Sequence, residues 1–332
     1  MMYYSPFLMI NMLTLMTSTI MAISSTNWLM VWLAMELNLI SFIPIMNNTY
    51  SFQETEASVK YLLIQALGSS LLIMSSLSLW FSHQIFINMN IILLFSLLIK
   101  IGMAPCHLWY PSVMTSISWI PALILSTWQK IAPLSIMSFF LMSTSTNIMM
   151  LLASMNALTG GLMGLNQSHL RTLMAYSSIT HMGWMMALIS NNMSMSTIIY
   201  FMFYSMLITP IFIMLYKLNT KTLSQMNSSK NDTKMQYLVL PMLFLSLGGL
   251  PPLTGFFPKW FSIFLLTPNS MIMLFILIAG SLMNLYFYLN IVFSIMLSTS
   301  KNKLNWNKSN KLNFSLITYM TLTMIPLIPL ML

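Results

Sequence analysis

The chain has 332 residues, of which 5% are charged and 58% are hydrophobic, whereas about a quarter of the residues of a soluble domain are charged. A soluble globule cannot bury so many apolar side chains and still present a wettable surface, so this class is excluded and most of the chain must lie in lipid. The net charge of +9 does not indicate nucleic-acid binding, because the basic residues lie between apolar segments instead of forming one solvated patch.

Apolar runs long enough to cross a hydrocarbon layer of about 30 Å, which takes about 20 residues, follow one another closely. The runs are continuous and do not alternate in polarity, which argues against a β-barrel. The sequence therefore predicts an all-α polytopic membrane protein, a single membrane domain over residues 1–332 with about eleven transmembrane helices. In chain order, the expected spans are 5–23, 27–46, 57–80, 89–118, 122–142, 147–165, 172–190, 194–216, 236–266, 270–297 and 314–332.

The distribution of charged residues predicts how these spans are oriented. With eleven spans, every basic loop falls on one side of the membrane, and the loops of the other side receive no Lys or Arg. We therefore expect the N-terminus inside and the C-terminus outside. The charged residues expected on the basic side are Lys60, Arg171, Lys217, Lys221, Lys230, Lys234, Lys301, Lys303, Lys308 and Lys311, together with Glu54, Glu56 and Asp232.

The cysteine count and the absence of nucleotide motifs limit the chemistry of the chain. Cys106 is its one cysteine, so it holds no intrachain disulfide and no cysteine cluster for zinc or an iron–sulfur centre. No Walker or dinucleotide-binding motif occurs, so ATP-driven transport and NAD binding have no basis in the sequence. The first residues, MMYYSPFLMINML, match no targeting pattern; we expect no removable segment, and synthesis inside an organelle.

Four ionisable residues lie within predicted spans, namely Glu36, Lys100, Lys130 and Lys259, and His181 is a fifth titratable group. A charge near the bilayer centre costs about 2.5 to 3.5 kcal/mol on insertion scales, so we expect these side chains to face one another inside the bundle. Buried ion pairs that fix helix register are one explanation, but one glutamate can neutralise only one lysine. A lysine left unpaired in a dry interior favours its neutral form, and a lysine that readily loses its proton can serve in a relay.

Prolines beside two of these lysines predict interrupted helices. In KIGMAPCHLWYP, Pro105 cannot donate to the backbone carbonyl four residues earlier. In LGGLPPLTGFFPKW, Pro251 and Pro252 leave the carbonyls of Leu247 and Gly248 without their helical donors. Open turns at membrane depth are tolerated only beside protein or water. The two segments are therefore candidate elements of a polar pathway.

The interrupted spans are the fourth and the ninth, and an offset of five helices means that they cross the membrane in opposite directions. This arrangement is typical of an inverted repeat, as found in ion transporters. The related halves would be residues 5–142 and 147–297, with 314–332 as an additional helix, and Glu36 would correspond to His181. His107, just after the first interruption, either extends a proton path or hydrogen-bonds a freed carbonyl. The small residues between Gly160 and Gly164 favour close helix packing.

Four segments carry a resemblance that extends over nearly the whole chain: KIGMAPCHLWYPSV around Lys100, STWQKIAPLSI around Lys130, LRTLMAYSSITHMGWM through His181, and GGLPPLTGFFPKW through Lys259. Together they resemble the antiporter-like membrane subunits of respiratory complex I, the NADH:ubiquinone oxidoreductase. Some animal members of this family have eleven helices. The resemblance implies that a glutamate pairs with a lysine on a broken helix, and that two further lysines follow; the matching residues are Glu36, Lys100, Lys130 and Lys259.

The resemblance also implies a function and a set of partners. The chain would be a subunit of the proton-translocating NADH:ubiquinone reductase in the mitochondrial inner membrane, with its N-terminus in the matrix and its C-terminus in the intermembrane space. It would hold no cofactor or metal itself, with FMN and iron–sulfur clusters in partner subunits. Its partners would be other membrane-arm subunits, including neighbouring antiporter-like chains and the quinone-site subunits, and membrane lipids, but no nucleic acid. His181 and His107 are additional relay candidates.

Two other functional classes remain open. One is a subunit of a cation/proton antiporter that exchanges ions down an existing gradient; sodium dependence without NADH would identify it. The other is a membrane scaffold that does not pump, in which the buried lysines pair helices. Assembly that survives loss of the charges, with pumping unchanged, would identify the scaffold.

Overall fold

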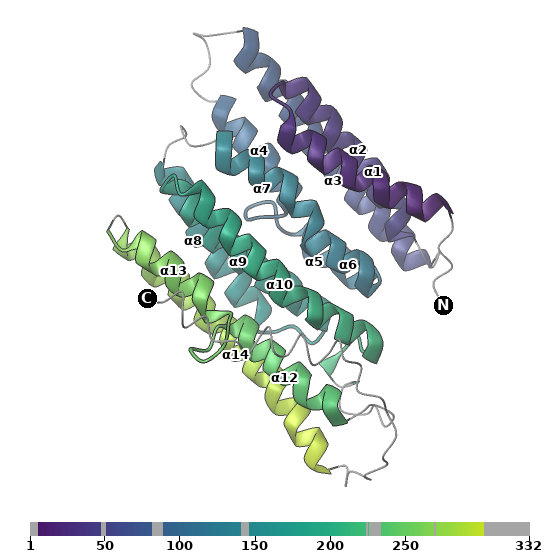
Figure 1. Ribbon diagram of the computed structural model, residues 1–332, viewed down its shortest axis with the longest axis vertical. Coiled ribbons are helices and arrows are strands. Elements are labelled where there is room, and N and C mark those ends of the chain that lie inside the picture. The colour runs from purple at the N-terminus through teal and green to yellow at the C-terminus, as the bar shows by residue number, and fades with distance from the viewer. Residues whose placement is uncertain are drawn as a thin grey trace. The chain divides into compact units, whose positions relative to one another are not determined.

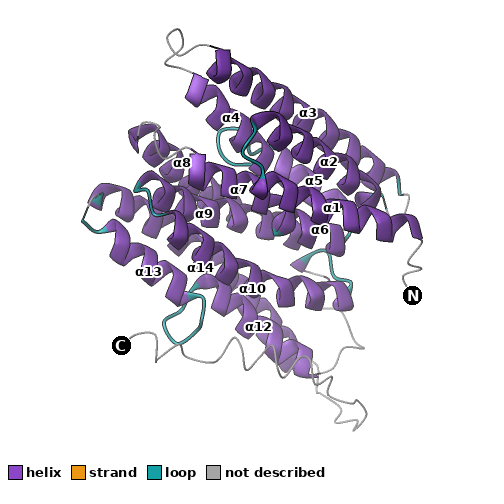
Figure 2. Ribbon diagram, turned by 45° about the horizontal axis from the view of Figure 1, so that its top comes forward, coloured by secondary structure: helices purple, strands orange, loops and turns teal. Residues whose placement is uncertain are grey.

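The structure, a computed structural model, describes residues 6–47, 51–81, 89–140, 146–223, 225, 234–268 and 270–301. Within these ranges the regular elements are helices, and the one β-type contact is an isolated bridge between His169 and Thr222 (Figure 2). The all-α prediction is therefore confirmed for the described part of the chain. The expected span 314–332 lies outside the described residues, as do Lys230, Asp232, Lys303, Lys308 and Lys311 of the basic loops.

The described residues divide into two units, and each contains some of the predicted site residues. The first unit extends to Leu152 and includes Asn192–Ser194, and the second contains Ala153–Asn191 and the residues from Met195 onward. The relation of the two halves by an inverted repeat stays a prediction.

In the first unit, α1, α2 and α3 lie side by side, α4 packs on α3, and α7 packs on α4 (Figure 1). The short helices α5 and α6 connect α4 to α7 along the chain. The bounds of the helices in this unit are α1 Pro6–Ser24, α2 Trp28–Met46, α3 Phe52–Phe81, α4 Met89–Ile101, α5 Trp109–Ser116, α6 Trp119–Ser126 and α7 Trp128–Phe140.

In the second unit, α12 packs on α14, and α9 packs on both α13 and α14. Every residue of α9 is buried, so this helix presents no side to lipid. The helices are α8 Thr146–Gly164, whose first residues belong to the first unit, α9 Leu170–Ser190, α10 Ser194–Leu218, α12 Lys234–Gly248, α13 Phe256–Leu266 and α14 Met271–Lys301.

Close packing in the second unit depends on glycines of α8, as the small-residue spacing predicts. A Cβ atom added at Gly160 would lie 2.7 Å from the backbone oxygen of Tyr176 on α9, and one added at Gly161 would lie 3.1 Å from the backbone oxygen of Gly280 on α14. Backbones can approach this closely only where no side chain intervenes. The packing role predicted for these glycines is confirmed.

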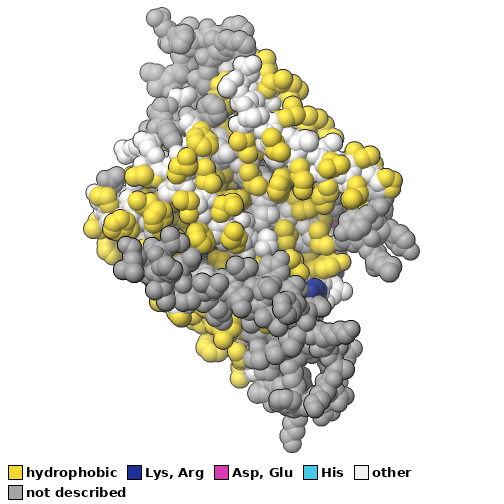
Figure 3. Space-filling model, in the orientation of Figure 1, with side chains coloured by type: hydrophobic (Ala, Val, Ile, Leu, Met, Phe, Trp, Pro, Cys, Tyr) yellow, Lys and Arg dark blue, Asp and Glu magenta, His cyan; other side chains and the backbone are white. Residues whose placement is uncertain are grey.

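Five helical segments of the described chain are long and apolar enough to cross a membrane, and eleven spans were expected. The segments are Pro6–Ser24, Trp28–Met46, Phe52–Ser78, Ser194–Leu218 and Met271–Leu297. Helices α8 and α9 are long enough but carry more polar residues, and interruptions divide the expected spans 89–118, 122–142 and 236–266 into shorter helices. Large apolar side chains cover much of the face in Figure 3, as expected for a surface that contacts lipid. A multi-pass membrane protein is thus supported.

Two expected boundaries are wrong. The expected span 122–142 is divided into α6 and α7 at Thr127, whose side-chain hydroxyl donates to the backbone oxygen of Leu123 at 2.8 Å. Helix α3 begins earlier than expected because the Ser51 hydroxyl accepts a hydrogen bond from the backbone N–H of Glu54 at 3.3 Å, which caps the helix. Glu54 and Lys60 therefore lie on a helix and not in a loop.

Candidate functional site

Helix α4 ends next to Lys100, and the backbone around Gly102 fixes that end. Gly102 has φ of +79°, and the N–H groups of Gly102 and Met103 donate to the carbonyl of Leu98 at 2.9 and 3.1 Å. This is a glycine C-cap in which a left-handed residue turns the chain out of the helix. The chain then passes through residues 103–108 before α5 begins at Trp109.

Two side chains satisfy backbone carbonyls in the last turn of α4. The Gln65 amide Nε2 donates to the carbonyl of Lys100 at 3.2 Å, and the Trp109 indole Nε1 donates to that of Ile99 at 3.1 Å. These carbonyls form the negative end of the helix dipole, so the backbone at Lys100 lies where a positive charge is favoured. Side chains of α3 and α5 therefore donate hydrogen bonds to the backbone carbonyls at the interrupted end of α4.

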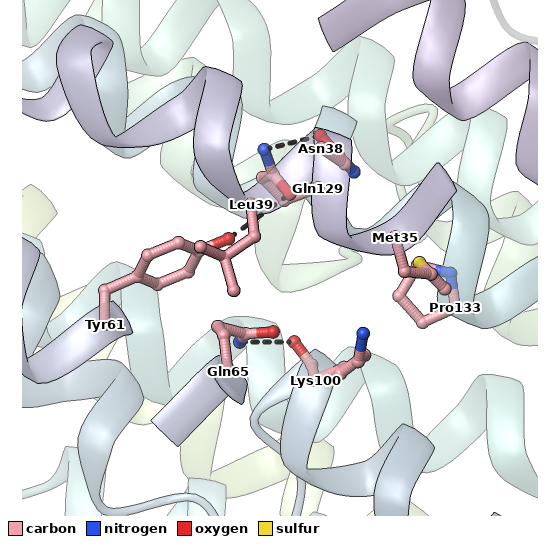
Figure 4. Close-up of a pocket in the computed structure, with 8 residues that line it drawn as sticks. All are labelled: Met35, Asn38, Leu39, Tyr61, Gln65, Lys100, Gln129 and Pro133. Carbon is pink, nitrogen blue, oxygen red and sulfur yellow. Dashed lines mark hydrogen bonds between the residues drawn. The ribbon is translucent and has the colours of Figure 1, made fainter. Parts of the chain in front are cut away.

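The Lys100 side chain is buried, with 8% of its surface exposed. It lines a small cavity together with polar residues of α2, α3 and α7 (Figure 4). Within the described residues its Nζ atom has no hydrogen-bond or ion-pair partner in the protein. Burial of an ammonium without such a partner costs free energy, so contact with a polar molecule would stabilise it.

The charge of Glu36 acts on Lys100, but the two groups do not form a direct ion pair. An ion pair within 4 Å joins Lys60 and Glu56 on the surface of α3. Glu36 is half-buried on α2 and is rotated about the helix axis by about 100° from Met35 and about 160° from Asn38, the two residues that line the cavity. The expected contact pair is therefore replaced by an interaction over a longer distance.

Lys130 is buried on α7, and its Nζ atom lies 4.6 Å from the centroid of the Tyr110 ring on α5. This is a cation–π contact, in which the negative face of the ring stabilises the ammonium. The preceding residue, Gln129, lines the cavity that contains Lys100. The first unit thus brings Glu36, Lys100 and Lys130 into one region.

His107 is buried in the segment between α4 and α5. Its backbone carbonyl accepts a hydrogen bond from the N–H of Tyr110 at 3.0 Å, so the histidine is held close to the aromatic partner of Lys130. His107 stays a candidate for the proton path.

Lys259 is buried in the first turns of α13, and its Nζ atom donates to the carbonyl of Gly248 at 2.7 Å. This carbonyl belongs to the last residue of α12 and is one of those that the Pro251-Pro252 pair was expected to free. Gly249, with φ of +82°, turns the chain away from α12. The ammonium therefore caps the negative end of the helix before the interruption.

His181 lies on α9, where its Nδ1 atom is 3.0 Å from the hydroxyl of Tyr200 on α10. The ring of Tyr204 lies 5.1 Å from the imidazole, measured between centroids. Helix α9 also packs against α13, which carries Lys259. The second unit thus contains a buried histidine and a buried lysine on helices that contact each other.

Several polar residues around these groups were not predicted from the sequence. They are Asn38, Tyr61, Gln65 and Gln129 at the cavity, and Tyr200 beside His181. A search for amide side chains inside apolar spans would have found three of them, because Asn38 follows Glu36 by two residues, Gln129 precedes Lys130, and Gln65 lies within an apolar run.

An all-helical membrane fold with lysines buried beside helix ends defines the class of antiporter-like membrane proteins. Residues 25–284 match the family of NADH:quinone oxidoreductase and Mrp antiporter transmembrane proteins. The chain belongs to this family.

The chain is similar to curated members over most of its length. It is 53% identical over 293 residues to NADH-ubiquinone oxidoreductase chain 2 of Lumbricus terrestris, with 88% of each chain covered. It is 39% identical over 337 residues to NADH-ubiquinone oxidoreductase chain 2 of Canis lupus familiaris, covering 98% of this chain and 97% of the relative. Among solved structures, a chain of respiratory complex I from Thermus thermophilus has a TM-score of 0.79 at 21% identity, covering 87% of this chain and 70% of that one. The antiporter-like fold is therefore confirmed.

Proposed function

We propose that the chain is a proton-translocating membrane-arm subunit of respiratory complex I. The observation that carries this proposal is the similarity to NADH-ubiquinone oxidoreductase chain 2 over most of the chain, at 53% and 39% identity. Electron transfer from NADH to ubiquinone would occur in partner subunits, which would hold FMN and iron–sulfur clusters. This chain would contribute proton transfer without a cofactor of its own.

The proposed relay consists of Lys100, Lys130 and Lys259, with Glu36 as a charge that regulates Lys100. At an effective dielectric of about 20, bringing a carboxylate and an ammonium from about 8 Å to about 4 Å changes their interaction energy by about 2 kcal/mol. A change of that size alters how tightly a lysine holds its proton by more than about tenfold. Movement of Glu36 relative to Lys100 would therefore control when the proton leaves.

The membrane arrangement follows from the same assignment. Helices α4 and α5 would form one broken span and α12 and α13 another, the two crossing in opposite directions within an eleven-helix inverted repeat. The protein would lie in the mitochondrial inner membrane with its N-terminus in the matrix and its C-terminus in the intermembrane space. The neighbouring antiporter-like chains and the quinone-site subunits would be its partners. Support comes from the helix ends at Gly102 and Gly249 and from the family match.

NADH-driven proton pumping by the reconstituted, fully assembled complex tests the relay. The variants are Lys100→Met and Lys130→Met, which keep side-chain length and remove the charge, and the matched control is Lys60→Met, which removes an exposed lysine of α3. We expect severe loss of turnover and pumping in the first two and near-normal pumping in the control. Complexes that assemble and pump normally without either buried lysine would support the scaffold class instead.

The family match also includes Mrp antiporters, so exchange of sodium for protons is the second candidate. An antiporter would show sodium-dependent proton movement in vesicles without NADH. We expect pumping that depends on NADH and does not change when potassium replaces sodium.

A further inference from the structure

Every residue of helix α9 is buried, so burial of apolar surface does not fix the rotation of this helix about its own axis. A helix with one apolar face turns that face toward the core, whereas a helix enclosed by protein has no such preference. The rotation of α9 matters because His181 lies near the middle of the helix and contacts α10. Directional contacts with neighbouring helices must therefore fix this rotation.

A hydrogen bond between α14 and α9 provides such a directional contact. The Asn284 Nδ2 group on α14 donates to the Thr180 hydroxyl on α9, and both side chains are at most 2% exposed. The Thr180 hydroxyl has one hydrogen, which it donates to the backbone oxygen of Ser177 at 2.7 Å. Its oxygen therefore acts as the acceptor toward Asn284, and the NH2 group of the Asn284 amide faces Thr180.

Close packing against α8 fixes the position of both partners. One turn before Asn284, α14 approaches α8 so closely that a Cβ atom added at Gly280 would lie 2.5 Å from the backbone oxygen of Ala157. On α8, Gly160 leaves space for Thr180, since a Cβ atom added at Gly160 would lie 2.5 Å from Thr180 Cγ2. These contacts determine how close the three helices come, and the hydrogen bond adds a direction.

The burial of the Asn284 amide is costly for an ordinary packing position. Its Oδ1 atom has no hydrogen-bond partner within the described residues, and burial of a polar atom without a partner is unfavourable. A leucine has a similar size and would fill the same space without this cost. The amide therefore adds a directional bond to α9 and lowers stability at Oδ1.

The contact of His181 with α10 depends on the rotation that Thr180 helps to fix. The two residues are consecutive, so their side chains leave α9 about 100° apart. His181 Nδ1 lies 3.0 Å from the Tyr200 hydroxyl. Rotation of the helix by about 20° would move an atom about 6 Å from the helix axis by about 2 Å. Since the heavy atoms of a hydrogen bond lie within about 3.2 Å, a movement of that size would break the contact.

We propose that Asn284 is a positioning residue, which acts through Thr180 to fix the rotation of α9 and thereby keeps the His181 imidazole in contact with the Tyr200 hydroxyl. Asn284 exchanges no proton itself, because an amide side chain is a hydrogen-bond donor and acceptor without a titratable proton. The importance of this contact for proton transfer rests on the proposed function, in which His181 is a relay candidate.

Cryo-electron microscopy of the complete complex tests the positioning directly. Asn284→Leu and Thr180→Val remove the hydrogen bond from its two sides and nearly preserve side-chain shape. We expect both variants to move His181 Nδ1 beyond about 3.5 Å from the Tyr200 oxygen. Asn290→Leu, the same substitution at an exposed position of α14, is the matched control and should leave this distance unchanged. Thr180→Val decides the test if Asn284→Leu does not assemble, and an unchanged contact overturns the proposal.

NADH-driven pumping tests the consequence for proton transfer. We expect Asn284→Leu and Thr180→Val each to slow pumping about tenfold, and the double variant to lose no more than either alone, because both changes remove the same bond. Thr180→Ser retains the hydroxyl and should keep the rate.

Two outcomes would overturn the proposal. Additive losses, or a loss in Thr180→Ser equal to that in Thr180→Val, would show that packing and not the hydrogen bond is responsible. Normal pumping with a displaced His181 would show that the contact has no part in proton transfer. Lys100→Met tests the proposed function separately: if it abolishes pumping while Asn284→Leu leaves His181 in place, the relay stands and the positioning role of Asn284 fails.

Discussion

The ammonium of Lys259 donates to the backbone oxygen of Gly248 at 2.7 Å and thereby joins the beginning of α13 to the end of α12. Lys100 differs, because Gln65 caps its backbone carbonyl, while its ammonium has no hydrogen-bond partner in the described part of the chain and its side chain lines a cavity. A carbonyl oxygen accepts a hydrogen bond but does not take a proton at physiological pH. The Lys259 contact is therefore suited to hold a charge in place, and the Lys100 environment is suited to release one.

Substitution of Gly249 should disturb Lys259. An L-residue at φ of +82° costs about 1 to 2 kcal/mol, and the added Cβ of Gly249→Ala would lie 3.0 Å from Lys259 Nζ. We expect a lower melting temperature of the assembled complex and slower pumping. Gly248→Ala is the matched control, since its Cβ would have ordinary contacts at 3.6 Å from Tyr288. Equal behaviour of the two variants would contradict the role of the Gly249 turn.

Glu36→Gln should reduce pumping less than Lys100→Met does. Glu36 acts on Lys100 through its charge and without direct contact, so its effect should require the ammonium. In a double-mutant cycle, we expect Glu36→Gln to change little once Lys100→Met is present, because residues that act on one another are not additive. Pumping and turnover of the four assembled complexes provide the measurement. Independent, additive losses would show that Glu36 acts elsewhere.

Tyr200→Phe should destabilise the second unit by about 1 to 3 kcal/mol, because the hydroxyl contacts His181 Nδ1 in a buried environment. Thermal unfolding of the assembled complex, followed by loss of NADH-driven turnover, measures the effect. Tyr286→Phe on α14 removes the hydroxyl of an exposed tyrosine and is the control. A melting temperature unchanged in both variants would mean that the His181 contact contributes nothing.

Gly160→Ala should weaken assembly. The added Cβ would lie 2.7 Å from the backbone oxygen of Tyr176, so α8 and α9 would have to separate. We expect a loss of about 1 to 3 kcal/mol in stability, seen as a lower yield of complete complex on native gels. Leu162→Ala, at an exposed position of the same helix, should assemble normally. A normal yield of Gly160→Ala would indicate that the helices are not this close.

The positions of α1 and α2 could be predicted from the sequence, because a long run of apolar residues is a strong signal for a membrane-spanning helix. The ends of the expected spans 5–23 and 27–46 lie within one residue of the ends of α1 and α2. The division of α6 from α7 at Thr127 was missed because neither a proline nor a glycine marks it. The Thr127 hydroxyl donates to the backbone oxygen of Leu123 there, and threonines make the same bond inside continuous helices, so the residue type alone does not mark the end of α6.

The charged members of the candidate site were predictable because charges are rare inside apolar spans. The uncharged polar residues around them were not predictable. The bonds from Tyr61 to Gln129 and from Gln129 to Asn38 join residues 68 and 91 positions apart, so no local pattern contains them. The separation of Glu36 from Lys100 was also unpredictable, because it depends on the rotation of α2 about its axis.

The complete burial of α9 has a consequence for biogenesis. A nascent segment leaves the translocon for the bilayer when its own side chains favour lipid, and α9, with Arg171 and His181, is not among the segments apolar enough to do so. Its insertion must therefore be cooperative: α9 is retained until the preceding and following helices supply a protein environment. The folding of the second unit thus begins at the insertion machinery, with several helices released as one group.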